Sequence, residues 1–280
     1  MCALTKLPIP RAHVCLVAHT AAEAAKPLST SARLCALADS RSQAVRAHCV
    51  VDTIENSLIA MLSRRDRASL RDISASVDLE LGTVLYEPGE PTRHVYFPID
   101  CFISLVAAAE GAPALEVGMV GREGMLGAQL VLGVGAMPLH ALVQGAGTAR
   151  RLAAAPFRRA LSASSSLQQA LNRYVYVLMA QLATSAVCTR FHNVEARLAR
   201  WLLMTQDRAH SDSFHLTHEF LAHMLGVRRV GITGAASDLQ RTGLIRYHRG
   251  AITVLDRPGL EAAACSCYAA DRQAYDGTLA

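Results

Sequence analysis

The sequence has few aromatic residues and no apolar run that could cross a membrane. Aromatic residues make up 5% of the 280 positions, and tryptophan occurs once. A membrane helix needs roughly 20 consecutive apolar residues, and no stretch of the chain approaches that length. The first residues also lack the apolar core behind a charged flank that marks a secretory signal. We therefore expect a cytoplasmic protein without a membrane partner.

Recognisable catalytic motifs are missing as well. The glycine-rich segments 133–137 and 145–150 lack the Gly-Lys-Ser or Gly-Lys-Thr that completes a phosphate-binding P-loop. Neither Gly-x-Ser-x-Gly nor His-Glu-x-x-His occurs, and no constellation of paired carboxylates is evident. These absences argue against an enzyme and leave a binding protein.

Cysteine is present but scattered, at positions 2, 15, 35, 49, 101, 188, 265 and 267. This spacing is not that of a disulfide scaffold, which again favours a reducing cytoplasm. The N-terminal cysteines are too far apart for an iron–sulfur cluster, and no histidine pattern supports haem. Cys265-x-Cys267 lacks partners at zinc spacing, so we interpret both as surface or packing cysteines. We expect no metal and no cofactor.

Residues 1–52 differ in composition from the rest of the chain. They are rich in Ala, Ser, Arg and Cys, show no sustained period, and contain as acids only Glu23, Asp39 and Asp52. We expect a disordered, dispensable extension, or upstream sequence that does not belong to the native product.

Residues 214–255 have the pattern of a compact DNA-reading unit. Thr217 stands where a helix N-cap belongs, with apolar residues at helical spacing behind it. Gly226 ends that helix, because a tight turn between helices needs a residue that tolerates positive φ. A second helix then opens at about Arg229 and runs to about Arg241. Its predicted buried stripe consists of Ile232, Ala235, Ala236 and Leu239.

The other side of this second helix is polar and begins with arginine, which suits insertion into the major groove of DNA. We predict base contacts from Arg228, Arg229, Thr233 and Ser237. An ordinary helical hairpin with a solvated face is the alternative for a lone pair of helices.

A basic hairpin after the second helix favours the DNA-binding interpretation. Residues 244–255 alternate around a turn, as the wing of a winged helix-turn-helix does. Segment 217–250 holds five arginines (228, 229, 241, 246 and 249) against Glu219 and Asp238, a local excess of positive charge in a chain of net charge +5. Such an excess attracts the DNA backbone without reading its sequence. We predict phosphate contacts from Thr217, His218, Arg246, His248 and Arg249.

These motifs resemble those of a known family. LTHEFLAHMLGVRR (216–229) and DLQRTGLIRYHRGAITVLDRPGLE (238–261) are similar to the C-terminal domain of the Crp/Fnr family of bacterial transcription regulators. LELGTVLYEPGEPTRHVYFPIDCFISL (79–105) resembles the opening strands of that family's cyclic-nucleotide-binding-type β-roll. The resemblance covers about residues 54–270.

The resemblance implies an α+β fold: an N-terminal antiparallel β-roll of the double-stranded β-helix or jelly-roll type, a long dimerisation helix and a C-terminal winged helix-turn-helix. In the family, the first arginine or two of the recognition helix bind guanine edges, and Arg229 matches the most regular of these positions. Val230 and Gly234 stand where members commonly carry Glu and Arg. The family's best-known operator sequence is therefore not expected for this chain.

The strand-rich middle of the chain supports the same architecture. Residues 79–152 form short segments punctuated by Gly and Pro, which predicts an antiparallel roll and argues against a parallel Rossmann-type sheet. Arg122, Glu123 and Gly124 are the candidate effector pocket, because the family's nucleotide-binding members hold the ribose there. Met137-Pro138 replaces the Arg-Ser that binds the phosphate in those members, and His140 is a poor substitute. Cyclic AMP is not the expected effector.

A long helix from Ser164 to about Arg190 follows the roll. Its apolar positions recur at close to heptad spacing, so we predict a dimer seam of Leu167, Leu171, Tyr174, Leu178, Leu182 and Ser185. The alternative is a helix packed only on its own β-roll. Residues 191–193 should break the helix before the DNA-binding domain.

The sequence therefore predicts a homodimeric, sequence-specific transcription regulator that binds a palindromic operator in double-stranded DNA and contacts RNA polymerase. Its domains should be an extension (1–52), an effector β-roll (53–163), a dimerisation helix (164–192) and a winged helix-turn-helix (193–280). Any small-molecule effector is unknown. The alternative is a cyclic-nucleotide- or redox-responsive regulator whose β-roll switches DNA affinity.

Overall fold

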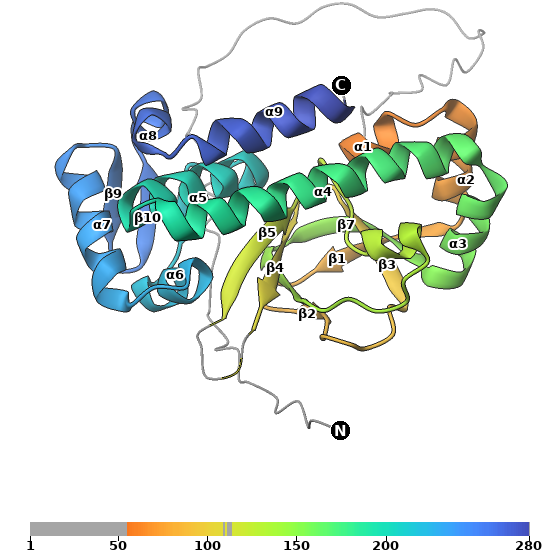
Figure 1. Cartoon of the computed structure of the whole chain (residues 1–280), viewed down its shortest axis with the longest axis horizontal. Helices are drawn as coiled ribbons and strands as arrows, with labels where there is room; N and C mark the ends of the chain where they lie inside the picture. The colour runs from red at the N-terminus through yellow and green to blue at the C-terminus, as the bar shows by residue number, and fades with distance from the viewer. Residues whose placement is uncertain (1–54, 109, 111–113, 280) are drawn as a thin grey trace, which may run out of the picture. The chain divides into compact units, whose positions relative to one another are not determined.

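The computed structural model describes residues 55–108, 110 and 114–279 (Figure 1). The predicted extension at 1–52 lies outside the described residues. Two short helices, α1 (Ser57–Ala60) and α2 (Arg64–Asp72), precede the first strand. Each has an N-cap whose side chain accepts a backbone N–H, Asn56 from Ile59 and Ser63 from Asp66.

Two antiparallel sheets form the N-terminal β-roll, as the pattern of short strands predicts. One sheet has the order β1-β7-β3 and the other β2-β6-β4-β5. Apolar side chains of both sheets fill the interior, among them Ile103, Val120 and Val143. The strands are β1 (Ser74–Leu79), β2 (Val84–Tyr86), β3 (His94–Pro98), β4 (Phe102–Ala107), β5 (Leu115–Val120), β6 (His140–Gly145) and β7 (Gly147–Ala153).

The long helix α4 (Ser165–Phe191) lies across the roll (Figure 1). It follows the 3₁₀ helix η1 (Ala128–Leu132) and α3 (Ala154–Ala163) in the chain. Ser164 caps α4 by accepting the backbone N–H of Leu167 at 3.2 Å, and the helix ends at Phe191, within the break that the sequence predicts.

The predicted dimer seam on α4 needs correction. Leu167, Leu171 and Tyr174 are fully buried within the protomer and pack in an apolar cluster with residues of the roll and of α3. The hydroxyl of Tyr174 also donates to the carbonyl of Met125 at 3.2 Å. These three positions therefore cannot meet a second copy. Heptad spacing alone does not say which of several apolar faces the protein's own core covers.

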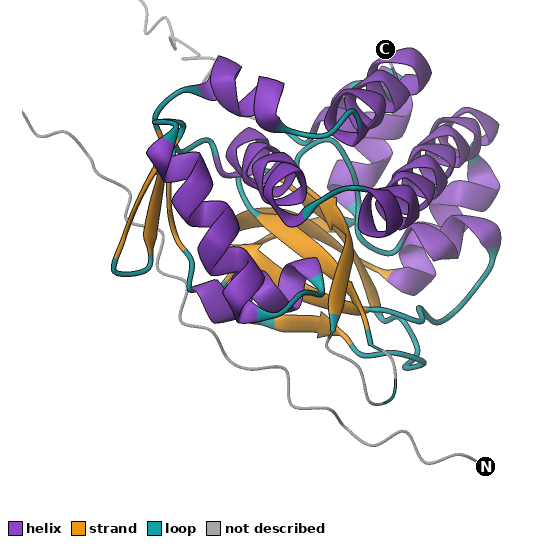
Figure 2. Ribbon diagram, turned by 60° about the vertical axis from the view of Figure 1, so that its left-hand side comes forward, coloured by secondary structure: helices purple, strands orange, loops and turns teal. Residues whose placement is uncertain are grey.

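The C-terminal part is helical with a small antiparallel sheet of order β8-β10-β9, whose hairpin stands beside helices in Figure 2. Its core combines Trp201, Leu221, Ile232 and Leu239 with strand residues such as Ile252. Its elements are α5 (Val194–Ala209), β8 (Ser213–His215), α6 (His218–Leu225), α7 (Arg229–Arg241), β9 (Ile245–His248), β10 (Ala251–Val254), α8 (Arg257–Ala263) and α9 (Cys267–Leu279).

Helix α9 runs back along α4 (Figure 1). Tyr275 and Leu279 near its end pack against the apolar cluster that also holds Leu171 of α4. An ion pair joins Asp271 of α9 to Arg200 of α5, with Oδ2 and a guanidinium nitrogen 2.5 Å apart. Within the part of the chain that the structure describes, no helix is long and apolar enough to span a bilayer.

Candidate DNA-binding site

Helices α6 and α7 form the helix-turn-helix that the sequence predicts. Thr217 caps α6, with its hydroxyl accepting the N–H of Phe220 at 3.1 Å. Gly226 ends α6 in the left-handed conformation, with φ at 60°. A side chain there would also meet Cδ1 of Leu115 at 2.9 Å. Both constraints favour glycine, and they fix the angle at which α7 leaves the turn.

The two sides of α7 divide as the periodicity indicates. Ile232, Ala235, Ala236 and Leu239 are buried, whereas Arg229, Thr233 and Ser237 are exposed at intervals of four residues. Thr233 donates its hydroxyl to the carbonyl of Arg229 at 3.1 Å, and Ser237 donates to that of Thr233 at 2.8 Å. These bonds hold the small hydroxyls along one exposed face of the helix.

The N-terminus of α7 is cationic. Arg228 is the N-cap residue, and its side chain makes no capping bond to the helix it precedes. The first turn, residues 229–232, contains no acidic side chain that would offset the positive end of the helix dipole. Two exposed guanidinium groups and unfilled backbone N–H groups thus occupy one helix end, a combination that attracts phosphate oxygens or guanine acceptors.

His218 connects the two helices to the wing. Its ring stacks on that of Tyr247, with centroids 4.4 Å apart and planes 14° apart. Its Nδ1 lies 3.0 Å from the hydroxyl oxygen of Thr233. Burial, followed by the charge of Arg229, lowers the pKa of His218, so the ring is held neutral at pH 7. The sequence did not indicate this bridging role, and it leaves the backbone N–H at the start of α6 as the group of His218 that can meet a phosphate.

Strands β9 and β10 form the wing. They pair from Ile245 with Val254 to His248 with Ala251. The turn between them places Arg249 at φ 48° and Gly250 at φ 84°, two left-handed residues in succession as a two-residue hairpin loop requires. Arg246, His248 and Arg249 are all exposed, so three basic or titratable side chains project from one short hairpin.

Comparison with known proteins agrees with this geometry. Residues 196–263 match the family model described as the Crp-like helix-turn-helix domain. The chain belongs to the Crp/Fnr family of transcription regulators. It is thus a DNA-binding regulator and not an enzyme. No curated protein matches the sequence.

Solved structures of Crp/Fnr regulators share the fold. A family member from Eubacterium rectale is 16% identical over 74% of this chain and 96% of its own, with a TM-score of 0.60. FixK2 from Bradyrhizobium japonicum is 14% identical over 69% of this chain and 98% of its own, with a TM-score of 0.59. CLP from Xanthomonas campestris, a c-di-GMP-responsive global regulator, is 14% identical over 69% and 100% of the two chains, with a TM-score of 0.58.

In this Crp/Fnr regulator the candidate effector residues face away from the roll interior. Oε1 of Glu123 accepts two hydrogen bonds from Arg208 of α5, at 2.7 and 2.9 Å, and one from the N–H of Gly121 at 3.2 Å. Arg122 and Glu123 line a cavity of about 240 Å³ whose other walls come mainly from α4, α5 and α9. The Glu123 carboxylate is thus engaged by the protein itself.

The other two positions have packing or pairing partners. A side chain at Gly124 would collide with the ring of Tyr174, so the backbone there approaches α4 closely. His140 lies where an arginine for a cyclic phosphate was considered, and its Nδ1 is 2.8 Å from a carboxylate oxygen of Glu87. Both observations favour structural roles for this segment.

The interpretation of Cys265 and Cys267 as cysteines without metal-site partners is wrong. Both are buried, and the fold brings them beside Cys188 and His192, with all four potential donor atoms within 4.8 Å of one another. The short sequence signals were Cys188-x₃-His192 and Cys265-x-Cys267. Neither is specific alone, and the chain between them exceeds 70 residues.

Proposed function

We propose that the protein acts as a homodimer on a palindromic operator, with α7 of each protomer in a major groove. The observation that carries this proposal is the arginine-headed, exposed face of α7 joined to a basic wing through His218 and Tyr247. Two such helices related by two-fold symmetry would reach half-sites about one helical turn apart.

We assign direct base contacts to Arg228, Arg229, Thr233 and Ser237. Arginine binds the O6 and N7 atoms of guanine in a bidentate manner, and hydroxyl groups bind several base edges. Val230, 75% exposed next to Arg229, offers an apolar contact for a thymine methyl group where relatives commonly carry Glu. A methyl group at Gly234 would meet no atom of the described residues within 4 Å, so its lack of a side chain leaves room at the interface.

Contacts to the DNA backbone fall to Thr217, His218, Arg246, His248 and Arg249. Four of these five side chains are exposed, and His218 contributes its backbone N–H. Phosphate contacts of this kind fix the register of the protein on DNA and make binding sensitive to salt.

The dimer should form through a face of α4 other than the predicted seam. Tyr176, Met179, Leu182 and Val187 are exposed apolar residues on this helix. They continue the helical spacing with Ala183 and Ala186, which are also exposed. Burial of such a stripe against a second α4 would remove an apolar surface from water and set the two α7 helices in a fixed relation.

The domain organisation follows from these roles: an effector β-roll at 53–163, the dimer helix at 164–192 and the DNA-binding domain at 193–280. The protein would work in the bacterial cytoplasm, where operator DNA and RNA polymerase are present. Cyclic AMP does not suit the Glu123 region, because its carboxylate is paired with Arg208. An effector that competes for this pair remains the alternative mode of control.

Selection of DNA by the full chain tests the proposal. The protein is incubated with a library of random double-stranded DNA at moderate salt, and bound molecules are enriched and sequenced. We expect an imperfect palindrome whose half-site centres lie about 10 bp apart. An enriched motif without two-fold symmetry would contradict the homodimer, and no enrichment over random DNA would contradict sequence-specific binding altogether.

A further inference from the structure

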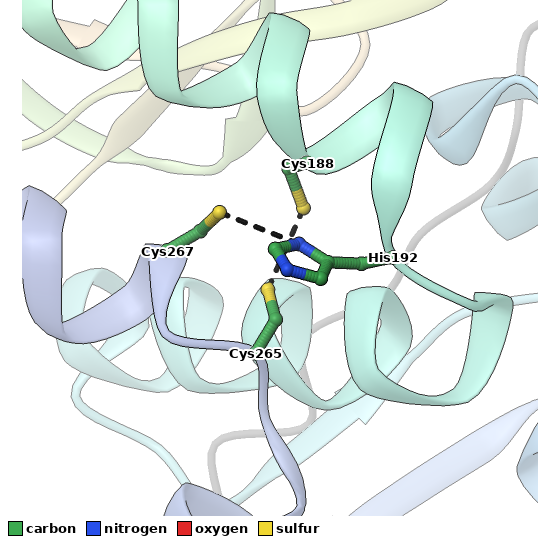
Figure 3. A group of neighbouring side chains, drawn as sticks. All are labelled: Cys188, His192, Cys265 and Cys267. Atoms are coloured by element: carbon green, nitrogen blue, oxygen red, sulfur yellow. Dashed lines mark hydrogen bonds between the residues drawn. The ribbon is translucent and has the colours of Figure 1, made fainter.

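Four metal-ligating side chains converge where α4 meets α5. Cys188, His192, Cys265 and Cys267 point toward one another in Figure 3. The sulfurs of Cys188 and Cys265 are 3.5 Å apart, and the sulfur of Cys267 is 3.5 Å from Nδ1 of His192. The three cysteines are buried. The donor set is three thiols and one imidazole.

Local structure holds these ligands in two pairs. Cys188 lies in the last turn of α4, and His192 is the C-cap residue, whose N–H donates to the carbonyl of Cys188 at 3.2 Å. Cys265 and Cys267 flank the start of α9, where the N–H of Tyr268 donates to the carbonyl of Cys265 at 3.1 Å. Each pair is fixed by backbone bonds, so a bound ion would not have to order flexible loops.

The separations match those around one tetrahedral zinc ion. Zinc binds thiolate at about 2.3 Å and imidazole at about 2.0–2.1 Å, which places its donors roughly 3.5–3.8 Å from one another in a tetrahedron. An iron–sulfur cluster distributes its ligands over several iron atoms and needs donors farther apart than those of a single ion. Soft sulfur donors with one imidazole favour zinc over magnesium, calcium or manganese.

The surroundings of the cysteines argue against simple packing. The sulfurs form a cluster of their own with Ala196, separate from the larger apolar cores of the described residues. A Zn²⁺ ion with three thiolates and a neutral imidazole has a net charge of −1, and such a charge needs compensation when buried. Arg197 and Arg200, both buried, lie near enough to interact electrostatically with Cys188 and Cys265.

We propose that Cys188, His192, Cys265 and Cys267 bind one structural zinc ion. Four protein ligands leave no open position, which is typical of structural and not catalytic zinc. The ion would fasten the α4–α5 junction, from which the DNA-binding domain begins, to the start of α9. Zinc binding at this place does not require that DNA binding or dimerisation be as proposed above.

Metal analysis of the full chain, purified with a reducing agent present, is the first test. We expect one zinc per chain by plasma mass spectrometry. After removal of zinc with a chelator, Co²⁺ should bind at one equivalent and give the visible and near-ultraviolet bands of tetrahedral cobalt thiolate. A reduced protein that holds no zinc and gives no such bands would overturn the proposal.

Matched variants assign the metal to these residues. Replacement of the other five cysteines (2, 15, 35, 49 and 101) by serine should leave one zinc per chain, as should His223→Gln, which alters a histidine outside the cluster. Cys265→Ser combined with Cys267→Ser should abolish stoichiometric zinc, and His192→Ala should weaken Co²⁺ binding by at least about 100-fold, because loss of a ligand exceeds loss of an outer partner. Zinc that disappears from the five-serine variant would place the site elsewhere.

A stability measurement on the unaltered chain covers variants that fail to fold. Zinc at about 1,000 times its dissociation constant should raise the thermal midpoint of the chelator-treated protein by roughly 10 °C. A disulfide is the competing outcome, since Cys188 and Cys265 are neighbours. If the chelator-treated, reduced protein shows no shift with zinc, or if mass spectrometry finds Cys188 and Cys265 joined in the protein as purified, the zinc site is refuted.

Discussion

Single side chains decide how this regulator reads DNA, and Arg229 has the most exposed position among them that is also anchored to a helix end. It begins α7, and its carbonyl accepts the hydroxyl of Thr233 one turn later. Arg249 differs, because it lies at the tip of a hairpin where no base edge is expected. The two arginines should therefore contribute in different ways, one to specificity and one to general affinity.

Replacement of Arg229 by alanine should cost about 1–3 kcal/mol of operator binding and relax the preference at one base pair of each half-site. The reason is the loss of a bidentate contact to a base, while the buried stripe of α7 stays intact. Fluorescence anisotropy with operator and random duplexes measures both affinities. An unchanged ratio between them would show that Arg229 does not read a base.

Arg249→Asn is the comparison for a phosphate contact. Asparagine tolerates the left-handed backbone at this position, whereas alanine would add strain that is unrelated to charge. We expect weaker binding to every sequence and a decrease of about 0.9 in the slope of log affinity against log salt. A loss confined to the operator would instead indicate base readout by the wing.

At the scale of elements, a buried carboxyl joins the roll to the DNA-binding domain. Glu116 of β5 accepts the indole N–H of Trp201 on α5 at 3.0 Å and the hydroxyl of Ser104 on β4 at 2.5 Å. The residue as a whole is partly exposed, but its carboxyl group is enclosed between these partners. Burial raises the pKa of Glu116 to about 7, above its ordinary value of 4.5.

This shift predicts a pH-dependent stability. Because the folded state binds the proton more tightly than the unfolded state, the stabilisation is complete below about pH 4.5 and is lost as the pH rises to about 7. Glu116→Gln keeps an acceptor for Trp201 and removes the titration. Urea unfolding at pH 5 and pH 8 should therefore show the wild type losing free energy of unfolding relative to the variant at the higher pH. A constant difference between the two proteins would refute the raised pKa.

At the scale of the whole molecule, α4 contributes to two surfaces. One side is fixed in the protomer's core by Leu171 and Tyr174. The other side exposes Tyr176 and Met179, although large apolar side chains are costly in water. The same helix can therefore carry the roll on one face and a second protomer on the other, which makes its orientation the link between effector domain and DNA spacing.

Met179→Asp should give monomers with weak operator affinity, because a charge would be buried in the proposed interface. Met179 is 62% exposed in the protomer, so the substitution should leave the folded monomer intact. Met61→Asp is a matched control on another element, with 51% exposure. Sedimentation velocity of the two variants gives the result, and dimers of Met179→Asp that match those of the control would exclude this face.

The DNA-binding unit could be read from the sequence because its signals are short-range. The cap at Thr217, the left-handed Gly226 and the buried stripe at Ile232 and Leu239 each depend on a few neighbouring residues. Backbone sterics and helical periodicity act over one or two turns, so local sequence determines them. The antiparallel roll was predictable for the same reason, from turns that recur between short strands.

Tertiary structure alone decided three other features. The sequence showed an apolar α4 but not which face its own roll would cover, and Glu123 showed a carboxylate but not Arg208, 85 residues away, as its partner. Cys188 and Cys265 are separated by 77 residues, yet their sulfurs come within 3.5 Å. Such contacts depend on how complete elements pack together, and no local preference of the chain encodes that geometry. The site that could hold zinc is therefore a product of the folded chain, whereas the helix that would read DNA was already specified by its own few residues.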